Sequence, residues 1–130
     1  MKLHHVGVAV KDLGAAIARH ERMGLKLAHR EVVASQKVEV AFMGDGPYVE
    51  LVAGTDASSN VSRFIDKRGE GQHHLAFSVP SISDELKKQE AAGATLIDSV
   101  ARPGAWGHNV AFLHPKDQGG VLIELVEESH

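Results

Sequence analysis

The chain has 130 residues, a formal net charge of −3 at pH 7 and 43% hydrophobic residues, which suits one compact domain with a substantial core. It has no cysteine, so disulfides, thiolate catalysis and cysteine-based zinc or iron–sulfur sites are excluded. It also lacks a dense basic run, a signal-like start and an apolar stretch long enough to span a membrane, so we expect a cytoplasmic protein without nucleic-acid or membrane partners.

The first part of the chain predicts one strand, one helix and three further strands. Residues 3–10 alternate in the manner of a strand, and the following "KDLGAAIARHERMG" has apolar residues at helical spacing until Gly24 ends the helix. Short segments rich in β-branched residues, bounded by turn signals, predict strands near 25–33, 36–43 and 47–53. The order of elements is βαβββ.

The second part of the chain repeats this order. After a polar stretch containing "NVSRFIDKRGEG", in which we expect a short helix, the pattern predicts a strand at 73–79, a helix over "SISDELKKQEAAG" and strands near 94–98, 107–114 and 120–127. His5 recurs as His74, and Val49-Glu50-Leu51 recurs as Ile123-Glu124-Leu125. We therefore expect an α+β fold in a single domain over 1–130, with module 1 at about 1–54, a linker at about 55–71 and module 2 at about 72–128.

Strand periodicity indicates which side chains lie away from the helices. Side chains alternate between the two faces of a strand, so the imidazoles and carboxylates lie opposite the large apolar residues that pack on the helices. One His and one Glu from each module thus form a candidate ligand set for a divalent ion: His5, Glu50, His74 and Glu124. Imidazole suits zinc, nickel, cobalt and iron, and two carboxylates balance the charge of a 2+ ion.

These residues and two longer motifs carry a family resemblance. The paired βαβββ modules resemble the vicinal oxygen chelate superfamily, in which the modules enclose a metal in a cup-shaped mixed or antiparallel sheet (the glyoxalase/bleomycin-resistance/dioxygenase-like fold). Within it, "FIDKRGEGQHHLAFSV", "VAFLHPKDQGGVLIELVE" and the opening "LHHVGVAVKDL" resemble the methylmalonyl-CoA epimerases. Some of these epimerases carry Gln where Glu50 stands, a departure that bears on the ligand charge and the metal preference.

The resemblance implies a metal-dependent isomerase that interconverts (R)- and (S)-methylmalonyl-CoA in propionate metabolism. It implies a divalent ion on the four ligands, cobalt first and zinc, nickel or manganese as alternatives, an acyl-CoA substrate and a homodimer. Proton exchange at the α-carbon is assigned by similarity to two bases, Glu39 and Glu124. Periodicity groups Glu39 with Ala41 and Met43, and we expect it to lie alongside Glu50, whereas its counterpart Asn109 cannot exchange a proton.

Two other function classes remain open at this point. A His, Glu, His, Glu ligand set also fits a lactoylglutathione lyase (glyoxalase I)-type isomerase, and an iron dioxygenase of the same fold would more often use two His and one carboxylate. A non-catalytic protein that binds a small molecule is the third class, and the four candidate ligands together with Glu39 argue against it. The fold by itself does not choose among these functions.

Overall fold

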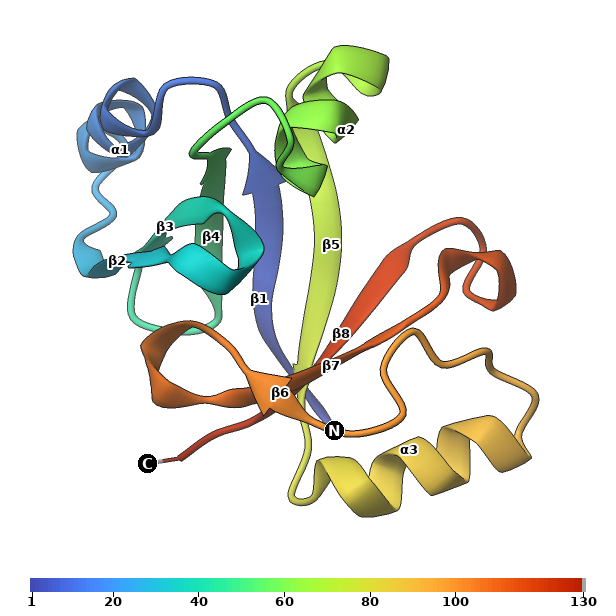
Figure 1. Ribbon diagram of the computed structural model, residues 1–130. Helices are drawn as coiled ribbons and strands as arrows, with labels where there is room; N and C mark the ends of the chain where they lie inside the picture. The colour runs from blue at the N-terminus through green and yellow to red at the C-terminus, as the bar shows by residue number, and fades with distance from the viewer. Residues whose placement is uncertain (130) are drawn as a thin grey trace. The chain divides into compact units, whose positions relative to one another are not determined.

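The computed structural model describes residues 1–129 and consists of two βαβββ modules with one further helix between them (Figure 1). The elements are β1 (Lys2–Ala9), α1 (Leu13–Arg22), β2 (Leu27–Val33), β3 (Val38–Met43), β4 (Tyr48–Gly54), α2 (Asn60–Arg68), β5 (Gly71–Ser78), α3 (Ile82–Ala91), β6 (Arg102–Pro103), β7 (Asn109–Leu113) and β8 (Leu122–Glu127), with short 3-10 turns at Ala34–Gln36, Ala105–Gly107 and Pro115–Asp117. The predicted order of elements and the linker helix are confirmed.

Two compact units make up the chain, one from His5 to His73 and the other from His74 onward together with Met1–His4. In residues 1–129, the helices are too short and too polar for any of them to cross a membrane.

Module 1 pairs its strands in the order β2-β3-β4-β1, with β1 and β4 parallel and the other two pairings antiparallel. Helix α1 packs on one face of these strands, where Leu13 and Ile17 meet Ala41 and Leu51 in a buried apolar cluster. We call this side of module 1 the helix face. The opposite side carries His5, Phe42 and Glu50, and we call it the histidine face.

Both module helices begin at the caps that their sequences offer. The Asp12 side chain accepts a hydrogen bond from the Ala15 backbone N–H at 3.0 Å at the start of α1. At the start of α3, the Ser81 side chain accepts a hydrogen bond from the Asp84 backbone N–H. Such caps satisfy one of the backbone N–H groups that a helix leaves unpaired at its start. Gly24 follows α1 with a φ of +98°, a conformation that favours glycine, and so turns the chain into the next strand.

Module 2 pairs its strands in the order β5-β8-β7-β6 and packs α3 on one face, where Ile82 and Leu86 meet Leu113 and Leu125. Here one prediction is wrong: residues 94–98 do not form a strand, because only Leu96 makes an isolated bridge, to Leu113.

The physical reason lies in Asp98. Its carboxylate accepts the Phe112 backbone N–H at 2.8 Å, so a side chain takes the place of the next backbone partner and the ladder stops. The edge strand β6 is only two residues long and pairs with β7 at Val110 and Asn109.

The packing of α1 on the helix face generates a stability prediction. Leu51 is fully buried in the cluster beneath α1, so Leu51→Ala should lower the free energy of unfolding by about 2–5 kcal/mol through lost burial and a residual cavity. Urea denaturation followed by circular dichroism measures this. Val32→Ala, at a 58% exposed position of β2, is the control and should change stability by less than about 0.5 kcal/mol. A cost below 1 kcal/mol for Leu51→Ala would contradict the assigned core.

Candidate metal centre

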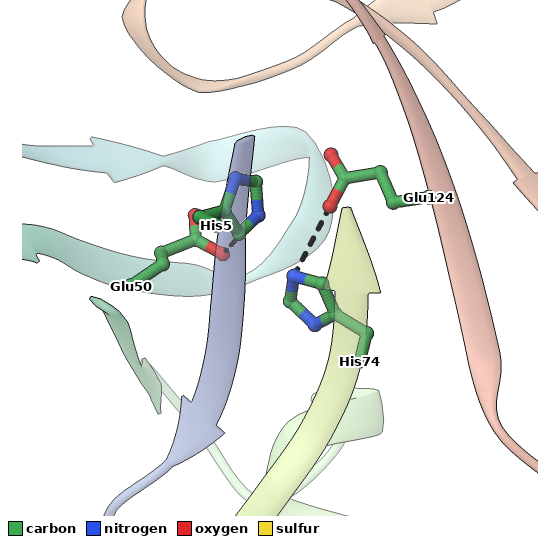
Figure 2. A network of polar contacts seen from close by, with 4 residues as sticks. All are labelled: His5, Glu50, His74 and Glu124. Atoms are coloured by element: carbon green, nitrogen blue, oxygen red, sulfur yellow. Dashed lines mark ion pairs between the residues drawn. The ribbon is translucent and has the colours of Figure 1, made fainter. Parts of the chain in front are cut away.

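The first candidate ligand pair lies on the histidine face of module 1. His5 Nε2 is 3.2 Å from Glu50 Oε1, and the two side chains are only 3% and 8% exposed (Figure 2). Gly7 on β1 is the direct neighbour of Glu50 and has no side chain. The Glu50 carboxylate therefore has room to approach the imidazole of His5, which lies two residues before Gly7 on the same face of β1. Removing a carboxylate from water is costly unless a charged or hydrogen-bonding partner compensates.

The second pair repeats this arrangement in module 2. His74 Nε2 is 3.1 Å from Glu124 Oε1, and these side chains are 6% and 10% exposed (Figure 2). Ala76, again a small residue, is the direct neighbour of Glu124 in the parallel pairing of β5 and β8. The structure thus brings each candidate His together with the candidate Glu of its own module.

An aromatic ring holds each imidazole in place. The Phe42 ring lies edge-on to His5 with 5.4 Å between ring centroids, and the Phe112 ring lies edge-on to His74 at 6.2 Å. Each Phe is the direct cross-strand neighbour of the Glu of its module, Glu50 or Glu124. A His, a Glu and a Phe thus form the same unit in both modules, which limits the rotamers available to the ligand side chains.

Each pair fits a divalent ion in its chemistry and its spacing. Two ligand atoms at adjacent corners of an octahedral shell with bonds of about 2.1–2.2 Å are about 3.0 Å apart. The Nε2 to Oε1 separations of 3.2 Å and 3.1 Å match that edge. The same separation suits a hydrogen bond when Nε2 carries a proton, so each pair has a satisfied state with or without an ion.

The expected placement of Glu39 beside Glu50 is wrong. Glu39 pairs directly with Ala53, whereas Glu50 pairs with Phe42, and directly paired residues share a face of the sheet. Glu39 therefore lies on the helix face, where its Oε2 accepts a hydrogen bond from Arg30 Nε at 2.9 Å. The grouping of Glu39 with Ala41 was correct, but Ala41 belongs to the cluster beneath α1.

A further His–Glu pair on the histidine face was missed from the sequence. His29 Nε2 is 2.7 Å from Glu31 Oε1, both on β2, and these side chains are 29% and 32% exposed. His29 pairs directly with Phe42, which places both residues of this pair on the same face as Glu50. The available signal was the spacing of two residues within a predicted strand, which puts both side chains on one face.

The other strand histidines have packing partners. His73 lies edge-on to Phe64 with 4.8 Å between centroids, and His4 lies edge-on to His108 at 5.4 Å. His4, His108 and Glu128 also offer potential ligand atoms within 4.8 Å of one another. However, His108 Nδ1 accepts the Ser129 backbone N–H, and a neutral ring with that acceptor carries its proton on Nε2, which opposes metal binding there.

Comparisons with known proteins identify the family of the chain. Residues 4–112 match the family model of the glyoxalase/bleomycin resistance protein/dioxygenase superfamily. The chain is 39% identical over 128 residues to the uncharacterized protein YqjC of Bacillus subtilis, covering 97% of this chain and 91% of that protein. It is 33% identical to the ethylmalonyl-CoA/methylmalonyl-CoA epimerase of Cereibacter sphaeroides, covering 95% of this chain and 96% of that enzyme.

A solved structure is similar over the same length. The crystal structure of methylmalonyl-CoA epimerase from Mycobacterium tuberculosis superposes with a TM-score of 0.93 at 38% identity, covering 99% of this chain and 89% of that one. Several relatives and structural neighbours are thus named as epimerases, which are isomerases. The chain therefore belongs to the glyoxalase/bleomycin resistance protein/dioxygenase superfamily and, within it, to the proteins related to the methylmalonyl-CoA epimerases.

Proposed function

We propose that the protein is a metal-dependent epimerase that interconverts (R)- and (S)-methylmalonyl-CoA. The observation that carries the proposal is the pair of equivalent buried His–Glu units, one in each module, in a chain related to epimerases. Solved relatives include an epimerase in complex with methylmalonyl-CoA and a Streptomyces coelicolor epimerase with 2-nitronate-propionyl-CoA. An acyl-CoA is therefore the substrate class that we propose for this chain.

Both His–Glu pairs would hold the same ion, with His5, Glu50, His74 and Glu124 as its protein ligands. Two carboxylates and two neutral imidazoles would balance a 2+ charge, and the ion could take substrate oxygens as further ligands. When bound, the ion supplies Lewis acidity that stabilises the negative charge formed on the substrate after loss of its α-proton. Cobalt remains our first expectation for the metal, ahead of zinc, nickel and manganese.

Proton transfer is the part of the reaction that falls to the side chains. Glu124 would take the α-proton from one face of the carbon between the thioester and the carboxylate, and the C–H electron pair would delocalise into the thioester. Inversion requires that a proton then return to the opposite face, so a second acid/base group is needed. The position of Glu39 on the helix face does not support it in this role.

Assembly and location remain predictions as well. We expect a homodimer, which sedimentation velocity of the purified protein measures, and a cytoplasmic location.

The function is tested by proton NMR in deuterated water. Wild-type protein with a divalent ion should exchange the α-proton of both methylmalonyl-CoA epimers for deuterium and equilibrate them. A parallel reaction with the hemithioacetal of methylglyoxal and glutathione tests the glyoxalase alternative, which the superfamily match keeps relevant. Turnover of the hemithioacetal alone would replace the proposal with a glyoxalase activity. Binding of the acyl-CoA without any exchange would indicate a non-catalytic protein.

The ligand assignment predicts loss of metal on truncation of one imidazole. His74→Ala should lose most of the bound ion, because it removes one ligand and leaves Glu124 without its imidazole partner. Metal analysis measures the stoichiometry, and thermal unfolding gives a second measure, since an ion that binds only the folded state raises the melting temperature. His20→Ala, on α1, is the control and should retain the ion. Unchanged stoichiometry in His74→Ala would contradict the ligand set.

Placement on the helix face generates a prediction for Glu39. Glu39→Gln should keep kcat within about threefold of wild type, because Glu39 lies on the face opposite the candidate ligands. The change alters only a partly exposed ion pair with Arg30, and such pairs contribute little to stability. Steady-state epimerisation assays measure kcat, with metal content determined on the same sample. A fall of kcat by about 10²-fold or more at full metal content would instead identify Glu39 as a general base.

A further inference from the structure

The proposed epimerisation leaves one role unassigned, and the histidine face of module 1 offers a group for it. In the proposed function Glu124 serves one face of the α-carbon, and inversion needs a second proton-transfer group for the other face. Glu39 lies on the wrong face, and its neighbour Val40, on the histidine face, has no proton to exchange. The inference that follows rests on the proposed function.

A row of directly paired residues leads from the metal ligand Glu50 to His29. Glu50 on β4 pairs with Phe42 on β3, and Phe42 pairs with His29 on β2. Neighbouring strands are about 4.8 Å apart, so the backbones at His29 and Glu50 are separated by about 10 Å with their side chains on the same side. His29, Phe42 and Glu50 therefore form a row on one side of module 1.

The Phe42 ring lies between the His5 and His29 imidazoles on the histidine face. Its ring is 5.4 Å from the His5 ring and 6.4 Å from the His29 ring, measured between centroids, and it is buried. Val40, also buried, is the direct neighbour of Glu31. Phe42 and Val40 thus make this part of the histidine face apolar, and His29 and Glu31 are the titratable groups that β2 and β3 contribute to it.

The His29–Glu31 pair differs from the two ligand pairs in its exposure. Its side chains are 29% and 32% exposed, against 10% or less for the four proposed metal ligands, so a substrate can reach it. The Glu31 carboxylate, 2.7 Å from Nε2, favours the tautomer with the proton on Nε2. That tautomer has its lone pair on Nδ1, the atom that can accept a proton from carbon.

Among residues 1–129, module 2 shows no matching His–Glu pair at the corresponding place, which makes the arrangement one-sided. Phe112 is flanked by β8 on one side, and on the other side its backbone carbonyl accepts hydrogen bonds from the backbone N–H groups of Ile97 and Asp98. Ile97 cannot exchange a proton, and the Asp98 carboxylate accepts the Phe112 N–H and pairs with Arg102. One His–Glu pair next to the ligand-bearing strands of module 1 suits one active site with distinct acid/base groups.

We propose that His29 is the second proton-transfer residue of the epimerisation and that Glu31 is its positioning residue. In one direction, His29 Nδ1 takes the α-proton, the C–H electron pair delocalises into the thioester, and Glu124, which carries a proton at the start of this direction, delivers it to the other face. In the reverse direction the two groups exchange roles. The carbon skeleton is unchanged and no oxidant or reductant is consumed.

The test compares three variants by NMR in deuterated water, with the metal-loaded protein and both methylmalonyl-CoA epimers. His29→Gln, which can hydrogen-bond but cannot accept a proton at neutral pH, should lower the epimerisation kcat by about 10²–10⁴-fold with metal content unchanged. It should still exchange the α-proton of one epimer, through Glu124, and should not exchange that of the other. Glu31→Gln should lower kcat with KM unchanged and show the same bias between epimers. His20→Gln, on α1, is the matched control and should behave as wild type.

A chemical rescue separates proton transfer from a structural effect. Added imidazole should restore part of the epimerisation by His29→Ala, because a free imidazole can occupy the space of the lost ring and accept the same proton. Wild-type epimerisation and exchange of both epimers in His29→Gln would overturn the role of His29 while leaving the epimerase proposal intact. A wild-type protein that exchanges neither epimer would overturn the proposed function and this role with it.

Discussion

A buried carboxylate beside an imidazole, present once in each module, is the constraint on which the rest of this structure depends. Glu50 and Glu124 lie almost completely out of water, and a charge in that position needs a partner. His5 and His74 meet this need, and the small residues Gly7 and Ala76 give the carboxylates room to reach them. The strands that carry these residues therefore have a polar site on one face and pack into an apolar core on the other.

Duplication explains why the two pairs are alike, and divergence explains how the modules acquire different chemistry. The His, Glu and Phe units of the two modules share their strand pairings and their edge-on ring contacts. Outside these units the modules differ. Module 1 completes the edge of its sheet with the seven-residue strand β2, whereas the Asp98 side chain interrupts the corresponding edge of module 2. The His, Glu and Phe unit is thus retained in both modules, while the His29–Glu31 pair stands beside it in module 1.

Glu39 illustrates the limit of periodicity. Alternation along a strand establishes that Glu39, Ala41 and Met43 share a face, and the structure agrees. It does not establish which face that is, because Ala41 is small enough to suggest an open surface and apolar enough to pack beneath a helix. The cross-strand pairs Ala41 with Leu51 and Phe42 with Glu50 resolve the ambiguity. On a strand buried on both faces, hydrophobicity carries too little contrast to identify the face that carries the site.

The sequence by itself determined the order of elements, the two-module repeat and the recurrence of one candidate His and one candidate Glu in each module. These features depend on the local periodicity of apolar residues and on the recurrence of motifs, and both can be read directly from the sequence. Only the tertiary structure decided that Glu39 lies under Arg30 on the helix face, that 94–98 is not a strand and that His29 and Glu31 stand beside Phe42. Each of these depends on register between strands, which is set by pairings between residues distant in the sequence.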